Sequence, residues 1–248
     1  MKIILSPAKK MVTDSDTLDA PSLPVYIERS EEIVTALKSL DYDSLLSLWG
    51  CSPKIAEQNI SRLSEMNLEK NLTPALLAYE GIAYQYMGPA VFEKKQYEYL
   101  ENHLRILSAF YGILKPFDGV VPYRLEMQAK LSVSGHDDMY SFWGDSLYRA
   151  LGDNVIINLA SLEYSRCIEK YMKDDDIFIT CVFGEEINGK VVQKGTYAKM
   201  ARGDMVRFMA ENNIRSPENI KEYNRMNYSF SKEHSTDSRY VFIRDRLR

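Results

Sequence analysis

The sequence has few cysteines, few histidines and no long apolar run. Its three cysteines, Cys51, Cys167 and Cys181, are an odd number and lie far apart without a CxxC pair. This pattern argues against a disulfide framework and favours a reducing compartment. The apolar run in MKIILSPAKKM is too short for a signal peptide, and no segment approaches the roughly 20 apolar residues of a membrane helix. We therefore expect a cytoplasmic protein that has no membrane partner.

The sequence also has no excess of basic over acidic residues. Lys and Arg total 31 against 35 Asp and Glu, which gives a net charge of -4. This balance excludes a nucleic-acid binder that is basic all over. A local basic cleft on an acidic body is compatible with it, because electrostatic steering depends on how charge is distributed. Any binding to DNA should then be modest and sensitive to salt.

The common catalytic and ligand-binding signatures are absent as well. The sequence contains no GxxxxGK[ST], no GxGxxG and no GxSxG. His103, His136 and His234 are far apart and lack the spacing of metal ligands. We therefore predict no metal site and no cofactor.

Strand and helix signals are interspersed without a regular βαβ count, which favours a mixed α+β fold. Apolar, β-branched runs predict buried strands over 2–5, 155–159 and 177–183. Turn signals predict a hairpin at Asn188-Gly189 and a last hairpin that joins 228–230 to 240–243. Apolar spacing predicts helices over 28–40, 44–49, 53–63, 91–109, 142–151, 161–172 and 197–211. With no repeat and no linker, a single domain over 1–248 is expected.

Residues 41–71 contain two short predicted helices that are joined by the tight turn of LWGCSPKIAEQN. Gly50 permits a sharp turn, Ser52 has the position of an N-cap, and Pro53 suits the first helical position. A helix-hairpin-helix element uses such a turn to bind a phosphate through backbone N–H groups, and Lys54 would add charge. Ser52 stands where the second glycine usually stands, and a positive φ would suit it poorly. An ordinary αα-hairpin is the open alternative.

Two loops have the composition of functional segments. Lys9 and Lys10 come directly after the first strand, where functional loops often begin. FYGILKPFDGVVPYRLEM at 110–127 combines glycine and proline with aromatic and charged residues, among them Arg124. Such a mixture is typical of an ordered loop that builds a site. Solvated lysines in the first loop and a structural crossover in the second are the alternatives.

The segment 197–208, YAKMARGDMVRF, predicts an amphipathic helix. At 100° per residue, its core face gathers Ala198, Ala201, Met205, Phe208 and Met209. Lys199, Arg202 and Arg207 fall on the adjoining face. Arg202 borders the apolar stripe, so its guanidinium should be half-buried and suited to bidentate phosphate or carboxylate contacts. A solvated helix face is the alternative.

Carboxylates near these basic segments keep catalysis open as a hypothesis. Asp118, Glu126 and Glu163 are the candidates. A lysine beside one of them could do acid–base or Schiff-base chemistry, and a Cys–His pair could assemble in space. The sequence singles out none of these pairs, so it does not decide whether the protein is an enzyme.

Several segments taken together resemble the YaaA peroxide-stress protein family of bacteria. They are LSPAKKM at 5–11, LSAFYGILKPFDGVVPYRLEM at 107–127, INLASLEYS at 157–165, YAKMARGDMVRF at 197–208 and RYVFIRD at 239–245. Their order and spacing cover nearly the whole chain. The resemblance implies one α+β domain of unusual architecture, with a helix-hairpin-helix element and a positively charged cleft. It also implies resistance to hydrogen peroxide, through lower free iron and less oxidative damage to DNA, with DNA binding as the activity.

Carried onto this chain, the resemblance implies that the cleft contains Lys9, Lys10, Arg124, Lys199 and Arg202. The turn with Gly50, Ser52 and Lys54 would lie beside it.

Three functions follow as hypotheses. The first is binding to double-stranded or distorted DNA without sequence preference. The second is an enzyme that acts on a small anionic substrate, phosphate-like or nucleotide-like, in the same cleft, with Asp118, Glu126 or Glu163 as acid or base. The third is direct iron handling, which the scattered histidines and cysteines do not support.

Overall fold

The computed structural model describes residues 1–14 and 16–245. Its central sheet contains β1 (Lys2–Leu5), β5 (Leu104–Ser108), β6 (Gly112–Leu114), β8 (Val155–Asn158), β9 (Ile177–Ile187), β10 (Lys190–Val192), β11 (Tyr228–Phe230) and β12 (Arg239–Arg244). The strand order is β11-β12-β9-β8-β1-β5-β6, and β10 pairs with β9. The inner strands from β12 to β5 are parallel to one another, whereas β6, β10 and β11 are antiparallel to their neighbours.

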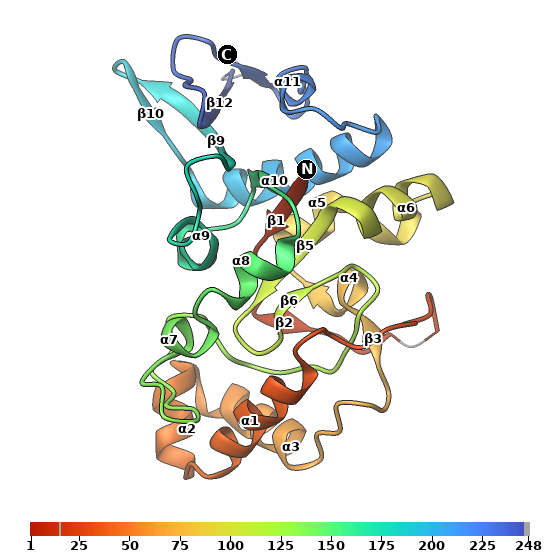
Figure 1. The fold of residues 1–248 in the computed structure, drawn as a ribbon, viewed down its shortest axis with the longest axis vertical. Coiled ribbons are helices and arrows are strands. Elements are labelled where there is room, and N and C mark those ends of the chain that lie inside the picture. Colours follow the sequence, from red (N-terminus) through yellow and green to blue (C-terminus); the bar gives the residue numbers. More distant parts are fainter. Residues whose placement is uncertain (15, 246–248) are drawn as a thin grey trace.

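Helices and two small strand pairs surround this sheet (Figure 1). The helices are α1 (Ile27–Lys38), α2 (Tyr42–Trp49), α3 (Pro53–Ser64), α4 (Ala75–Ala78), α5 (Ile82–Met87), α6 (Lys94–His103), α7 (Met139–Trp143), α8 (Ser146–Leu151), α9 (Leu162–Glu169), α10 (Gly195–Glu211) and α11 (Pro217–Ile220), with a 3-10 turn at Pro89–Val91. The small pairs join β2 (Lys10–Met11) to β4 (Tyr79–Glu80) and β3 (Thr73–Pro74) to β7 (Gly119–Val120). In Figure 1, α1, α2 and α3 lie at one end of the long axis, and β10, β12 and α11 lie at the other.

The mixed sheet and its helices confirm the predicted α+β class. The strand β1 has the predicted bounds, and three of its four residues are buried. The turn between β9 and β10 places Asn188 at φ +52° and Gly189 at φ +73°. Both values are typical of a tight two-residue hairpin. The last hairpin, β11 with β12, also forms as predicted.

The helix predicted over 91–109 is too long, because only residues 94–103 are α-helical. α6 ends at His103, and Leu104 takes φ -80° and ψ 137°, which starts β5. All five residues of β5 are buried. A run that is buried on both faces has no periodicity to separate a strand from a helix. Pairing with β1 and β6 decides the structure here.

The helix predicted over 142–151 is interrupted. Gly144 has φ +52° and ends α7, and α8 begins two residues later at Ser146. This backbone conformation is outside the helical region, and glycine adopts it without the penalty that a Cβ brings.

The long helix α10 packs on α5 at a very close crossing. The predicted apolar stripe of α10 is buried as expected. A Cβ added to Gly203 would lie 1.8 Å from the carbonyl oxygen of Ala83. The two backbones therefore approach each other as only glycine allows at this position.

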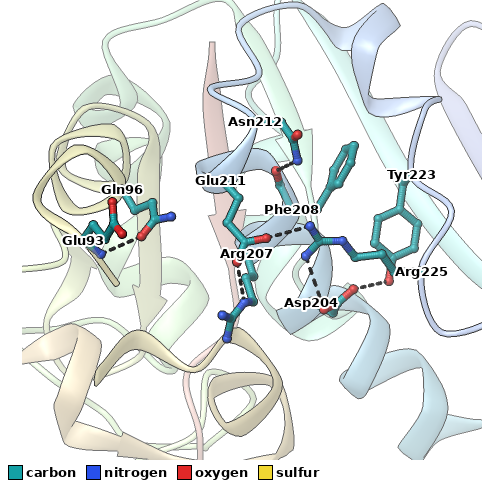
Figure 2. Close-up of polar contacts among 9 residues, drawn as sticks. All are labelled: Glu93, Gln96, Asp204, Arg207, Phe208, Glu211, Asn212, Tyr223 and Arg225. Atoms are coloured by element: carbon teal, nitrogen blue, oxygen red, sulfur yellow. Dashed lines mark hydrogen bonds and ion pairs between the residues drawn. The ribbon is translucent and has the colours of Figure 1, made fainter. Parts of the chain in front are cut away.

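Charged residues tie the C-terminal half of α10 to the chain that follows it. Arg207 Nε donates to Glu211 at 2.7 Å, and Arg225 Nη2 donates to the other carboxylate oxygen at 2.6 Å. Tyr223 donates to Asp204 at 2.8 Å. Figure 2 shows these groups converging on one side of the helix. Arg207 is thus committed to an ion pair.

The two helices predicted around Gly50 are present as α2 and α3. Gly50 has φ +50° and ψ 48°, so it supplies the left-handed turn. Ser52 has φ -69°, so serine is not strained there, but its side chain accepts no capping hydrogen bond. The helix pair is observed, and its assignment as a helix-hairpin-helix element stays a prediction.

No helix in 1–14 and 16–245 is both long enough and apolar enough to cross a membrane.

Candidate functional site

The order of the strands creates a crevice between β1 and β8. The chain passes from β1 to β5 on one side, whereas β8 continues to β9 and β12 on the other side. Ligands of parallel sheets bind outside the carboxyl ends of strands at the point where the direction of strand order reverses. A cavity of about 540 Å³ opens at this point. The loops that follow β1 and β8 both line it, and we call this cavity the cleft.

The cleft has an apolar floor and a basic rim. The buried residues of its lining are Leu5, Tyr84, Tyr123, Leu125, Leu159 and Tyr164. Lys9, Lys10 and Lys199 are exposed at the rim, and Arg124 and Arg202 are half-buried between the two zones. All five basic residues that the family resemblance placed in a cleft therefore line this one cavity.

Arg202 is a cation that has no counter-ion among residues 1–14 and 16–245. Its Nε is buried and finds no hydrogen-bond partner. Burial lowers the pKa of Arg202, and the one titratable group that raises it is Cys181. Burial also raises the pKa of that thiol to about 12, so it is neutral and balances no charge. The guanidinium stays protonated at neutral pH, and its charge is left for a ligand of the cleft.

The three lysines of the rim differ in whether a carboxylate of the protein already pairs with them. Lys9 Nζ lies 2.6 Å from Glu126 Oε1, and Lys10 Nζ lies 2.7 Å from Glu80 Oε1. Lys199 forms no ion pair or hydrogen bond with a residue of 1–14 or 16–245. It lies one helical turn before Arg202 on α10, so these two cations form the uncompensated part of the rim.

Arg124 connects the cleft to the turn between α2 and α3. Its Nη2 donates to the carbonyl oxygen of Trp49 at 3.4 Å and lies 3.8 Å from Glu126 Oε1. Its Nε is buried without a partner. Because Trp49 directly precedes Gly50, the turn lies next to the cleft.

The predicted turn residues are outside the lining of the cleft. Gly50, Ser52 and Lys54 are exposed to solvent. The structure thus brings the five basic residues together, and it puts the turn beside them through Arg124.

Comparison with known proteins now identifies the family. A family model described as peroxide stress protein YaaA matches residues 1–234. The chain belongs to that family. A UPF0246 protein of Agathobacter rectalis is 58% identical over 246 residues, which cover 98% of this chain and 99% of the relative. UPF0246 proteins of Lachnoclostridium phytofermentans and Pediococcus pentosaceus are 50% and 48% identical, over 98% and 100% of this chain and 96% and 99% of theirs. The family name supports the predicted role in peroxide stress.

Two of the three candidate carboxylates of this YaaA-family protein line the cleft. They are Glu126 and Glu163. Asp118 does not line it, because its side chain accepts from Ser22 Oγ and from the backbone N–H of Lys115, both at 2.8 Å. These bonds hold the loop in shape, which gives Asp118 a structural position.

Glu163 is oriented by backbone donors. Its Oε1 accepts from the N–H groups of Met127 at 3.0 Å and Gln128 at 3.4 Å. Its Oε2 accepts no hydrogen bond from the part of the chain that the structure describes. Burial raises the pKa of Glu163, and the nearby charge of Glu126 raises it further. One carboxylate oxygen is therefore free to contact a ligand.

Sequence reasoning missed several residues of the cleft. Ser6 accepts from the backbone N–H of Ser161 at 2.8 Å and so joins the loop after β1 to the loop after β8. Glu80 and Tyr84 come from β4 and α5, where no motif marked them. The signal that could have found Ser6 and Ser161 is their position within three residues of the end of a buried strand.

Proposed function

We propose that this protein acts in peroxide stress by binding DNA without sequence preference. The observation that carries this proposal is Arg202, a half-buried guanidinium in the wall of an open cleft, which has no counter-ion in the part of the chain that the structure describes. Taking a charged group out of water costs several kcal/mol unless an opposite charge compensates. A backbone phosphate supplies that charge, and Lys199 beside Arg202 adds to the attraction.

The turn beside the cleft offers a second phosphate site in the same proposal. The first N–H groups of a helix have no partner inside the helix. Ser52 does not cap α3 with its side chain, and Lys54 in its first turn is exposed. We expect the start of α3 to bind a phosphate on the strand that runs past Arg124.

We propose that this binding protects DNA against peroxide by displacing cations from its backbone. Cationic side chains that contact phosphates release the counterions condensed on DNA. Iron cations held near the backbone would be among those displaced, and less oxidative damage would follow. We propose that lower free iron in the cell is an indirect consequence of the same protection.

The test measures binding of a fluorescent duplex over a series of salt concentrations. The Lys199→Gln, Arg202→Gln double variant should bind at least tenfold more weakly, with a shallower dependence on salt. Arg207→Gln removes a cation from the same helix outside the cleft and should bind like the wild type. Equal binding by the double variant and the wild type would show that DNA does not use the cleft.

A separate pair of variants tests the turn. Lys54→Gln should weaken duplex binding and flatten its salt dependence by about one phosphate contact. Lys38→Gln changes an exposed lysine at the end of α1 and serves as the control. Identical curves for the two variants would remove the turn from the proposal.

An enzyme acting on a small anionic substrate is the second candidate. Glu163 favours it, because a carboxyl group with a raised pKa and a free oxygen lies in the same cavity as Arg202. Such a group is suited to general acid–base catalysis. A substrate of this kind should raise the melting temperature at concentrations near its Kd. No stabilisation by a broad set of phosphate esters would count against an enzyme.

A further inference from the structure

We propose that the cleft takes one nucleotide at a time, with its phosphate at Lys199 and Arg202 and its base on the tyrosine floor. The N–H edge of the base would face Glu163. This inference rests on the proposed phosphate binding and narrows it to a chemical class of ligand. That ligand is a nucleoside monophosphate unit, either free or extruded from a DNA strand.

The size of the cleft limits what can enter. A volume of about 540 Å³ is that of a pocket for a small molecule. A whole duplex is too large for a cavity of this volume, because its major groove alone is about 12 Å wide. The part of a DNA molecule that fits is one unstacked nucleotide, at an end, a gap or a bulge. The phosphates of a paired duplex would then reach Lys199 and Arg202 from the mouth of the cleft and the turn from outside it, while the bases stay stacked.

The floor offers aromatic surface. Tyr123 uses its hydroxyl for Tyr79 at 2.9 Å and Ser108 at 2.7 Å, and Tyr84 donates its hydroxyl to the carbonyl oxygen of Ser6 at 3.0 Å. Tyr84 and Tyr123 are only 4% and 6% exposed, so a ligand would contact the small part of each ring that lines the cleft. Aromatic side chains of this kind stack on nucleobases, since every base has a π-face.

The carboxylates are the feature that a plain phosphate site does not explain. Glu126 is paired with Lys9, but Glu163 has no ion pair in the described part of the chain and would repel a small inorganic anion held in the same cavity. Glu163 matches a ligand that carries an anionic group at one end and N–H donors at the other. Guanine presents two neighbouring N–H donors to one carboxylate. In thymine the single N–H lies between two carbonyl oxygens, which a carboxylate disfavours.

The experiment is a calorimetric titration of the whole protein with four compounds. They are deoxyguanosine monophosphate, thymidine monophosphate, deoxyguanosine and inorganic phosphate. We expect the guanine nucleotide to bind at least tenfold more tightly than each of the other three. Arg202→Gln should weaken both nucleotides by a similar factor, whereas Glu163→Gln should reduce the preference for guanine over thymine at least fivefold. Arg207→Gln should change neither affinity.

A competition assay identifies the source of the nucleotide. In this assay, free guanine nucleotide is added to the protein bound to a fluorescent duplex that has one unpaired guanine. Displacement of the duplex would show that the cleft holds an extruded base. A free nucleotide that binds the protein without displacing this duplex identifies a free nucleotide as the ligand. Both results support a nucleotide in the cleft.

Three other results would overturn the inference. Phosphate that binds as tightly as the nucleotides would show a site for anions alone. Undetectable nucleotide binding, together with duplex binding that falls with salt and needs Lys199 and Arg202, would leave the proposed DNA binding intact and remove only the nucleotide. Loss of both kinds of binding would remove the proposed function itself.

Discussion

Glu163 is a carboxyl group whose surroundings disfavour its charge. Burial and Glu126 raise its pKa above the ordinary value of 4.5. Near and above pH 4.5 the folded protein therefore binds more protons at this group than the unfolded chain does. The free energy of unfolding falls as pH rises from about 4.5 through the raised pKa of the folded state.

Glu163→Gln should remove this pH-dependent loss of stability. At pH 7 the variant should unfold at higher temperature than the wild type, because no buried charge remains. The difference should shrink toward zero as pH falls below about 4.5, where the carboxyl group is neutral in both states. Melting curves from pH 3.5 to 8 measure this. A constant difference across that range would contradict the assigned protonation.

Replacing Arg202 should change stability and binding in opposite directions. Arg202→Met keeps an unbranched apolar side chain and removes a buried charge that no described residue balances, so the free energy of unfolding should rise by about 1 kcal/mol. Phosphate and DNA binding should fall in the same variant. Urea denaturation and DNA titration measure the two effects.

Arg207→Met is the matched control on the same helix. It breaks the 2.7 Å ion pair with Glu211, so the free energy of unfolding should be unchanged or lower by up to about 1 kcal/mol. DNA binding should stay the same. If both variants were destabilised equally, Arg202 would have a structural partner that balances its charge.

At the scale of elements, the crossing of α10 over α5 holds the two walls of the cleft together. α5 contributes Tyr84, and α10 contributes Lys199 and Arg202. Gly203→Ala places a Cβ 1.8 Å from the backbone oxygen of Ala83, so one helix must move. We expect the free energy of unfolding to fall by at least about 2 kcal/mol and ligand binding to weaken as the walls separate.

Gly195→Ala tests whether this effect belongs to the crossing. A Cβ at Gly195, at the start of the same helix, meets no atom within 4 Å. Alanine there should leave stability unchanged or raise it by up to about 1 kcal/mol. Urea denaturation of both variants is the measurement. A tolerated Gly203→Ala would mean that the helices separate at little cost.

Some helices and strands could be predicted from their own sequence, and others could not. β1 and α10 were predicted because their apolar residues follow a strand run and a helical stripe within the element itself. β5 was missed because all five of its residues are buried, so its sequence shows no alternation of apolar and polar residues, and only its pairing with β1 and β6 makes it a strand. The break at Gly144 was missed because a single glycine does not end a helical pattern unambiguously.

For the whole molecule, the salt dependence of DNA binding should be smaller than the number of basic residues suggests. Lys9 and Lys10 already pair with Glu126 and Glu80. Lys54, Lys199 and Arg202 have no ion pair with a residue in the described part of the chain. About three phosphate contacts correspond to a slope of roughly -2.7 for the logarithm of the binding constant against that of the salt concentration.

Glu80→Gln should make this slope steeper by about one unit, because it frees Lys10 to contact a phosphate. Glu98→Gln removes an exposed carboxylate of α6 and should leave the slope unchanged. Fluorescence titrations between 50 and 200 mM salt cover the range in which such contacts are measured. A steeper slope in both variants would indicate a general effect of net charge.

The candidate site could be predicted in part. The family resemblance implied that five basic residues meet, and they do line one cavity. The spacing of the sequence could not show that Glu80 pairs with Lys10, because β2 and β4 are about 70 residues apart. The tyrosine floor was also hidden, since Tyr84, Tyr123 and Tyr164 reach the cleft from three separate segments.

The pairing of β1 has a consequence for the newly made chain. Ile3 pairs with Leu104 and with Ile157, which are made about 100 and 150 residues later. At about 5–20 residues per second, the ribosome needs roughly 8 to 30 s to reach the second partner. During that interval Ile3, Ile4 and Leu5 are exposed apolar side chains on a nascent polypeptide. We expect chaperones to bind this segment, and the cleft to be complete only after translation has passed α10, which contributes Lys199 and Arg202.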